Sequence, residues 1–230
     1  MKLILVGNPN VGKSSVINSL TGSQFFASNY PGTSTEIEKA ILKINGTEFE
    51  FYDSLGVYSL YSDSEEANVT RSLLEKEKHD LIINIVDATN LERNLLLTLE
   101  LAEKGYPLLV LLNQIDRARE FGIHIDVDAL AEILQYPVMA FSAINHEGVG
   151  EFRRFLQQFA ATGMVTEAQN QAPVAPSIIV LGDNFSCSGN CGNCTVDRGT
   201  CSIDLDMKLA EKARKTARAV ITTKPPSAGK

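Results

Sequence analysis

The sequence predicts an α/β fold, built on a mostly parallel sheet of about six or seven strands with helices on both faces. Two observations carry this prediction. Short apolar runs bounded by polar residues recur through residues 1–160, as buried strands of a helix-covered sheet do. Segments with helical spacing of apolar residues separate these runs, and such alternation is typical of parallel sheets. The expected strands are residues 2–6, 37–44, 48–53, 81–86, 107–112 and 137–141.

The connections between these strands follow from local signals. Asn45-Gly46 separates two strand-like runs, which predicts a tight hairpin and one antiparallel edge strand. Residues 21–35 are rich in Gly, Ser, Thr, Asn and Pro, a composition that indicates a loop. The expected helices are residues 13–20, 91–104, 126–134, 147–160 and 204–220. Leucines recur through 91–104, and acidic residues stand at the start of 126–134, as helix dipoles favour.

Composition changes after residue 161. Ala, Gln and Pro dominate residues 162–177, which indicates a linker. The sequence therefore predicts one domain over residues 1–161, a small Cys-rich and helical appendage over 178–221, and a flexible tail over 222–230.

Length and charge exclude several classes of protein. The chain has 230 residues, 44% of them hydrophobic, enough for a substantial core. Its formal charge of −7 argues against nucleic acid as a partner, since phosphate contacts need clustered Lys and Arg. No apolar run approaches the ~18–20 residues of a membrane span, and the apolar start is too short for a signal peptide. We therefore expect a soluble, cytosolic chain.

A glycine-rich motif lies between the first expected strand and the first expected helix. It fits G-x-x-x-x-G-K-[ST] without a mismatch, and consists of Gly7, Asn8, Pro9, Asn10, Val11, Gly12, Lys13 and Ser14. In such a P-loop, backbone N–H groups and the positive end of the helix surround phosphates. Lys13 is expected to reach the β- and γ-phosphates and Ser14 to ligate Mg²⁺, with Ser15 also contacting the nucleotide.

Two further motifs complete a nucleotide site, each at the end of an expected strand. Asp53-Ser54-Leu55-Gly56 fits D-x-x-G. Asp53 is expected to hold Mg²⁺ through water, and the Gly56 N–H to sense the γ-phosphate. The second is a base-recognition set, Asn113-Gln114-Ile115-Asp116 with Ser142-Ala143. The Asp116 carboxylate can accept two hydrogen bonds from guanine, which adenine cannot offer. Together the motifs predict a P-loop GTPase fold.

The motifs and their neighbours resemble one family. The segments 7–10, 29–32 (Asn-Tyr-Pro-Gly), 53–60 and 86–94 (Val-Asp-Ala-Thr-Asn-Leu-Glu-Arg-Asn) are similar to the N-terminal G domain of the ferrous iron transport protein B (FeoB) family. The resemblance covers about residues 1–160. It implies a GTP-binding and GTP-hydrolysing domain at the cytoplasmic face of the bacterial inner membrane, joined to a membrane permease for Fe²⁺. A homo-oligomer is left open.

The chain departs from the family pattern in switch I, the first nucleotide-sensing loop. The family's Mg²⁺-contacting Thr corresponds here to Ser34, which lies between Thr33 and Thr35. We expect Thr33 and Ser34 to contact GTP and Ser34 to ligate Mg²⁺, although each of the three hydroxyls is a candidate. Leu55 stands where the family usually has Pro, and the segment after residue 162 is shorter than the family's helical domain.

Hydrolysis is expected to depend on Asn10, Lys13, Ser34 and Gly56. Val57 occupies the position at which Ras-like GTPases place a water-orienting Gln, and valine cannot orient water, so intrinsic turnover should be slow. The resemblance implies that Asn10 ligates K⁺ beside the phosphates, where a cation stabilises transition-state charge. The alternative is that Asn10 simply tolerates an unusual backbone conformation.

A cysteine cluster lies in the predicted appendage. Its four thiols are Cys187, Cys191, Cys194 and Cys201, and glycines between them leave the backbone free to wrap a metal. Four thiolates suit an iron–sulfur cluster, iron or tetrahedral Zn²⁺, and the alternative is a reduced loop without metal.

Two other classes of function stay open. One is a free-standing GTPase in RNA modification or ribosome assembly, and the other is a metal-sensing module in which nucleotide only sets conformation. The histidines His79, His124 and His146 are isolated in sequence and are expected to be structural. Glu65 and Glu66 are expected to be solvated, and Asp126 and Asp128 to begin a helix. The basic helix 204–220 either faces an anionic membrane or is a solvated face.

Overall fold

The structure, a computed structural model, describes residues 1–22, 25–29, 36–163 and 202–223. Its centre is a seven-stranded sheet with the order β2-β3-β4-β1-β5-β6-β8. The strands are β1 (Lys2–Gly7), β2 (Phe25–Asn29), β3 (Glu36–Ile44), β4 (Thr47–Asp53), β5 (Leu81–Asp87), β6 (Leu108–Asn113) and β8 (Val138–Ala140). From β4 to β8 all pairings are parallel, while β2, β3 and β4 pair antiparallel. This confirms the predicted α/β class.

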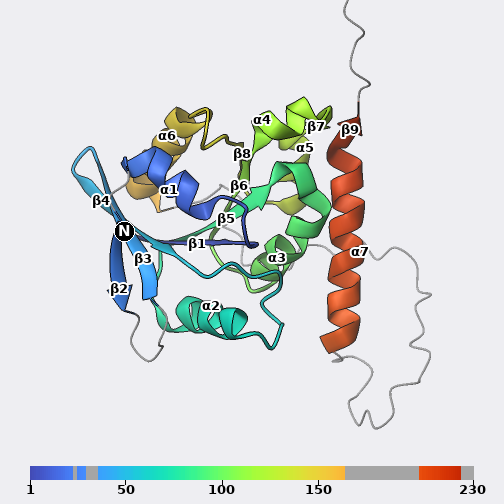
Figure 1. Ribbon diagram of the computed structural model, residues 1–230, viewed down its shortest axis with the longest axis horizontal. Coiled ribbons are helices and arrows are strands. Elements are labelled where there is room, and N and C mark those ends of the chain that lie inside the picture. The colour runs from blue at the N-terminus through green and yellow to red at the C-terminus, as the bar shows by residue number, and fades with distance from the viewer. Residues whose placement is uncertain (23–24, 30–35, 164–201, 224–230) are drawn as a thin grey trace, which may run out of the picture.

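Helices cover both faces of the sheet (Figure 1). They are α1 (Lys13–Thr21), α2 (Glu65–Lys76), the short 3₁₀ helix η1 (Ala88–Asn90), α3 (Leu91–Glu103), α4 (Ile115–Glu120), α5 (Val127–Leu134), α6 (Val149–Thr162) and α7 (Ser202–Val220). Alternate β1 side chains separate two cores. Leu3 and Leu5 pack with α1 and α6, whereas Ile4 and Val6 pack with α2 and α3. Since both faces are covered, the central strands are largely apolar, and the polar Asn84 inside β5 is buried and hydrogen-bonded.

The hairpin between β3 and β4 forms as the Asn-Gly signal predicts. Asn45 and Gly46 have φ values of 49° and 83°, and Ile44 pairs with Thr47 across the two-residue turn. Positive φ at both central residues is the requirement of the tight hairpin turn that best matches strand twist.

Two expectations about this end of the sheet were wrong. The segment 21–35 was expected to be a loop, but β2 forms within it and pairs with β3. The edge strand is therefore β2, and β3 lies inside the sheet. Composition around β2 is dominated by turn-forming residues, so the strand owes its conformation to hydrogen bonds with β3, which local sequence does not encode.

Helix α2 begins where no helix was expected. The Ser64 hydroxyl accepts a hydrogen bond from Ala67 N at 3.1 Å and so caps the first turn. Glu65 and Glu66 are exposed in that turn, where the helix dipole favours acidic residues. Their predicted solvation is confirmed. At α5, Asp126 caps the helix through Ala129 N at 3.0 Å, which confirms its predicted place.

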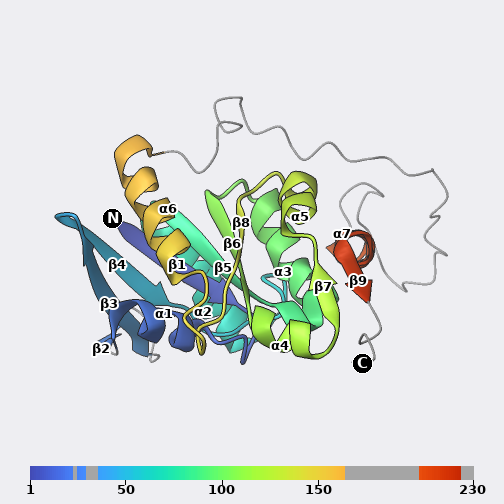
Figure 2. The same cartoon turned by 90° about the horizontal axis from the view of Figure 1, so that it is seen from above.

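Helix α7 lies against α3, on the outer side of one core (Figure 2). It buries Leu209, Ala213, Ala217 and Val220 in that core, and Arg214 Nε donates to Glu92 Oε1 at 2.8 Å. A following strand, β9 (Ile221–Thr223), pairs antiparallel with β7 (Ile123–Ile125). Thr222 and Thr223, expected in a flexible tail, therefore belong to a strand. Among the described residues, no helix has the length and apolar character that crossing a membrane requires.

The packing of α7 can be tested with one matched pair of substitutions. Ala213 is 1% exposed, so Ala213→Leu should overpack the α3–α7 contact and cost about 1–3 kcal/mol. For a chain of this size that is about 2–4 °C of melting temperature per kcal/mol. Ala210→Leu, exposed on the same helix, is the control and should change stability by less than ~0.5 kcal/mol. Equal melting temperatures for the two variants would contradict the packing.

Candidate functional site

The predicted site residues meet at the carboxyl edge of the parallel sheet. Register places Leu5 beside Asp53, Gly7 beside Ile85, and Asp87 beside Asn113. The loops that follow β1, β4 and β6 therefore leave the sheet at the same edge. In open α/β sheets this edge is where ligands bind.

The P-loop backbone is held too closely for side chains at two of its positions. A Cβ on Gly7 would lie 2.5 Å from the Ile85 carbonyl oxygen, and one on Gly12 would lie 2.5 Å from Asn113 Nδ2. Gly12 has a φ of 91° and caps α1 without a side chain. No side chain at Gly12 therefore occupies the first N–H groups of α1, which is what an anion-binding helix start requires.

Lys13, Ser14 and Asp53 form a polar group beside this helix start, in which Lys13 and Asp53 are half-buried and Ser14 is exposed. Ser14 Oγ donates to Asp53 Oδ2 at 2.7 Å, while Asp53 Oδ1 is buried and has no hydrogen-bond partner among the described residues. Burial raises the pKa of the Asp53 carboxyl, against the Ser14 hydrogen bond and the Lys13 charge. Burial also lowers the pKa of the Lys13 ammonium, against the attraction of Asp53.

This group fits a hydrated divalent cation. Mg²⁺ prefers hard oxygen ligands and usually keeps several waters. The Ser14 hydroxyl and the unpaired Asp53 oxygen are such ligands, and both lie next to the phosphate-binding helix start. The structure thus brings together Ser14 of α1 and Asp53 of β4, two of the three residues expected to hold Mg²⁺, while Ser34 lies outside the described residues.

The loop after β4 is tied to the P-loop. Val57 N donates to the Gly7 carbonyl oxygen at 3.1 Å. A Cβ on Gly56 would lie 2.8 Å from Pro9 Cα and 3.3 Å from Lys13 Nζ, so only glycine fits this approach. The Val57 side chain is 3% exposed and packs in the core with Leu60. It faces away from solvent, in agreement with the expectation that it orients no water.

A pocket beside the P-loop holds the base-recognition residues. Its volume is about 190 Å³, and it is lined by Asn10, Gly12, Ser15, Asn113, Gln114, Asp116, Arg117, Ser142, Ala143 and Ile144. Arg117 and Ile144 were not among the expected contacts. Arg117 follows the motif by one residue and Ile144 follows Ser142-Ala143 directly, so proximity in sequence was the available signal.

Asn113 connects this pocket to the P-loop. Its Nδ2 donates to the Val11 carbonyl oxygen at 2.9 Å, and its Oδ1 accepts from Ala143 N at 3.2 Å. The side chain is 3% exposed. Gln114 follows with a φ of 63° and ends the strand, which turns the chain into α4 and presents Asp116 to the pocket.

The segment after Gly56 is anchored to α3 by a residue that sequence reasoning missed. Glu100 is fully buried and accepts hydrogen bonds from Ser59 Oγ at 2.7 Å and Leu60 N at 2.6 Å. Nearby, the guanidinium of Arg93 lies 4.1 Å from the ring centre of Tyr58. A carboxylate among the leucines of α3 was the only sequence signal, since its partners come from another loop.

Several predicted residues lie outside the described part of the chain. These are Thr33, Ser34 and the four cysteines Cys187, Cys191, Cys194 and Cys201. Asn10 is described, with a φ of 65°, which is the unusual backbone conformation weighed as the alternative to K⁺ binding.

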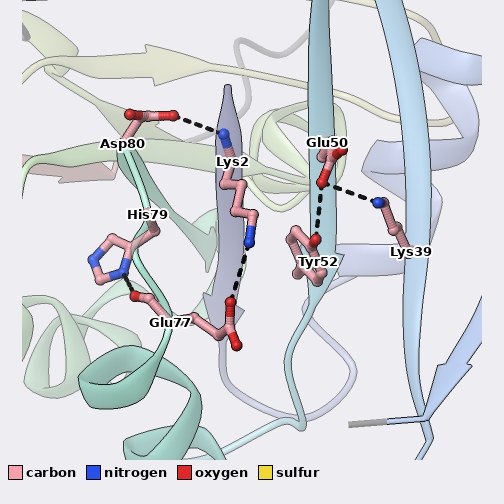
Figure 3. Close-up of polar contacts among 7 residues, drawn as sticks. All are labelled: Lys2, Lys39, Glu50, Tyr52, Glu77, His79 and Asp80. Carbon is pink, nitrogen blue, oxygen red and sulfur yellow. Dashed lines mark hydrogen bonds and ion pairs between the residues drawn. The ribbon is translucent and has the colours of Figure 1, made fainter. Parts of the chain in front are cut away.

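His79 belongs to a polar cluster at the opposite end of β1 from the P-loop (Figure 3). Its Nδ1 lies 3.0 Å from the Glu77 carbonyl oxygen. The Lys2 ammonium pairs with Glu77 at 3.2 Å, and Lys2 N donates to Asp80 at 2.7 Å. These contacts join the strand start to the end of α2, which supports the expected structural role of His79.

The fold and this edge of the sheet define a P-loop nucleotide-binding domain of the GTPase class. A P-loop, a serine–aspartate pair beside its lysine, and an Asn-x-x-Asp pocket share one edge of the sheet. The chain belongs to the ferrous iron transport protein B family, because residues 1–156 match the model of that family.

Individual relatives agree with this assignment. The Fe(2+) transporter FeoB of Campylobacter jejuni is 40% identical over 149 residues, which cover 65% of this chain and 24% of the relative. The cytosolic domain of T. maritima FeoB in its apo form has a TM-score of 0.67 at 32% identity, covering 72% of this chain and 66% of that chain. A GDP-bound E67A mutant of S. thermophilus NFeoB has a TM-score of 0.62 at 42% identity, covering 66% and 58%. The chain spans about a quarter of the length of the curated relatives that it matches.

The buried charge of Asp53 leads to a test without nucleotide or Mg²⁺. Because the folded-state pKa of Asp53 is raised, its carboxylate costs stability as the pH rises through that pKa, and the cost is absent below the unfolded value. Asp53→Asn should therefore melt at a higher temperature than wild type at neutral pH, with the two converging below about pH 4. Thermal melts across pH measure this.

Asp63→Asn is the control for that measurement, since Asp63 is exposed. It should follow wild type at every pH. A lower melting temperature for Asp53→Asn at neutral pH would show that the Asp53 charge stabilises the empty site.

Proposed function

We propose that the chain is the GTP-binding and GTP-hydrolysing domain of a ferrous iron uptake transporter, at the cytoplasmic face of the bacterial inner membrane. The observation that carries the proposal is a pocket lined by Asp116, in which the Asn113 side chain joins the P-loop to the loop after β8. Relatives named as Fe(2+) transporters support the link to iron uptake. A GDP-bound FeoB structure supports the binding of guanine nucleotides.

Guanine selection rests on Asp116. A carboxylate accepts hydrogen bonds and cannot donate them, so it matches the N1–H and amino group of guanine. Adenine lacks this pair of donors and would leave the carboxylate poorly satisfied. Ser142 and Ala143 form the wall behind the base, held through the Asn113 side chain.

The remaining residues have roles at the phosphates. Lys13 neutralises the β- and γ-phosphates, and the backbone of residues 7–12 surrounds them. Ser14 and Asp53 hold Mg²⁺, which neutralises phosphate charge when bound, and Ser34 or its neighbour Thr33 adds a switch I hydroxyl. The Gly56 N–H donates to the γ-phosphate. Because Val57 is buried in the core, turnover without an activator is slow.

Potassium is proposed as that activator, with Asn10 as its ligand. Asn10 lines the pocket beside Gly12 and Ser15, and its side chain is exposed rather than packed in the core. The positive φ of Asn10 does not prevent its amide oxygen from facing a cation, because the backbone conformation fixes only the direction in which the side chain leaves the backbone. A cation here would stabilise charge that develops during phosphoryl transfer.

Coupling to an Fe²⁺ permease of the same protein is proposed to pass through the loop after β4. GTP would order this loop through Gly56, and hydrolysis would release it. Glu100 ties the loop to α3, and α3 also packs against α7. A change at the γ-phosphate therefore has a packed path to the C-terminal helix.

The first test measures turnover of GTP and ATP in potassium and in sodium buffer. We expect GTP to be preferred and K⁺ to raise the rate at least about tenfold over Na⁺, as an added transition-state contact does. Asn10→Ala should lose the K⁺ effect while binding GDP in Na⁺ as wild type does. Equal use of ATP would refute guanine selection, and a K⁺ effect that survives in Asn10→Ala would refute the Asn10 role.

For the cysteine cluster we propose an iron–sulfur or zinc site formed by Cys187, Cys191, Cys194 and Cys201. Protein purified without oxygen should contain iron with sulfide, or zinc, in stoichiometric amount. Replacement of all four thiols by serine should remove the metal and leave GDP affinity unchanged, since the nucleotide residues lie elsewhere in the sequence. Protein without iron or zinc would refute a metal site.

A further inference from the structure

Asn145 makes a contact that the base-recognition motifs do not include. Its side-chain Nδ2 donates to Asp116 Oδ2 at 3.1 Å. The orientation of the Asn145 amide follows from chemistry, because a carboxylate can only accept and so must face the NH₂ group. The contact joins the loop after β8 to the first turn of α4, two segments that are 29 residues apart in sequence.

The loop that carries Asn145 is held from both sides. Asn145 N donates to Ser142 Oγ at 3.2 Å, and Ser142 is 1% exposed. Ser142 and Glu147 exchange two backbone hydrogen bonds, each 3.1 Å long. The Glu147 carboxylate makes two contacts with the Arg119 guanidinium, both 2.8 Å. The backbone at Asn145 is therefore held in place by contacts with α4 and with Ser142, just after β8.

Asp116 needs such support. It stands in the first turn of α4, a helix of six residues, and its side chain is only partly buried. A carboxylate in this position can rotate about two side-chain torsions. One hydrogen bond from Asn145 to Oδ2 restrains that rotation, and the lone pairs that stay available on both oxygens can still accept from a base.

Ile144, the residue before Asn145, cannot supply this hydrogen bond to Asp116 from its side chain. It follows Ser142-Ala143 directly and is 76% exposed, and its aliphatic side chain has no hydrogen-bond donor for the site. The neighbouring amide supplies the polar contact from the same loop.

We propose that Asn145 is a positioning residue that orients the Asp116 carboxylate and so sharpens the selection of guanine. The proposal rests on the proposed binding of guanine nucleotides. Guanine offers Asp116 two donors, whereas hypoxanthine, which lacks the 2-amino group, offers one. The advantage of the second donor depends on both carboxylate oxygens being in place, so it falls when Asp116 is free to rotate.

The test compares affinities for GDP, IDP and ADP in wild type and Asn145→Ala. The GDP-to-IDP affinity ratio should fall about 3- to 10-fold in Asn145→Ala, the size expected when one hydrogen bond is lost. Glu147→Gln is the matched control, since it weakens the Arg119 contact of the same loop and leaves the Asn145 amide intact. A purely structural role would lower affinity for GDP and IDP alike, in both variants.

A second variant, Asn145→Asp, supplies a pH readout. At high pH its carboxylate repels Asp116, and the ratio should fall at least as far as in Asn145→Ala. As the pH falls, the acid pair shares one proton, and the protonated oxygen donates to the other as the amide did. The GDP-to-IDP ratio should then recover.

The other charged groups near this pair are Arg117, Arg119, Glu147 and His146. Wild type is measured over the same pH values, so that any change not caused by the substitution is subtracted. An unchanged ratio in Asn145→Ala, or a ratio in Asn145→Asp that shows no recovery at low pH, overturns the positioning role. Wild type that binds ADP as well as GDP would instead refute the proposed guanine site itself.

Discussion

The nucleotide site depends on one buried amide, the side chain of Asn113. It reaches the P-loop through the Val11 carbonyl oxygen and the wall of the base pocket through Ala143 N. Both ends of the amide are thus satisfied inside the protein, where an unpaired polar group would be costly. The same amide lies so close to Gly12 that no side chain fits there. The phosphate half and the base half of the pocket are therefore one rigid arrangement.

Much of the fold could be predicted, because buried strands leave recognisable apolar patterns in the sequence. Strands β5 and β6 are buried on both faces and read as largely apolar runs, in which Asn84 is a buried polar residue of β5. The Asn45-Gly46 turn is equally local, since its φ values depend on those two residues. Strands β2, β7 and β9 could not be predicted, because each is short and exists through pairing with a distant segment. The cap at Ser64 was a readable signal for α2 that the loop composition around it obscured.

The residues of the candidate site likewise fall into those that the sequence predicted and those that it did not. Asp53 at the end of β4, and Lys13 and Asp116 at the starts of α1 and α4, follow from motifs whose spacing fixes their chemistry. Glu100 and Asn145 act through partners that are 40 and 29 residues away, and neither belongs to a motif. The sequence does not give the spatial distance between segments of the folded chain. The partners of buried or loop-borne polar residues are recognised only once that distance is known.

The pairing of β7 with β9 has a mechanical consequence. Strand β7 follows α4 after a turn at Phe121 and Gly122, and α4 begins at the base-recognition motif. Because β9 is hydrogen-bonded along β7, tension applied to the C-terminal strand is transmitted to the helix that carries Asp116. The same strand continues directly from α7. A pull on this strand would therefore strain the pocket wall formed by Asp116 before it reached the P-loop.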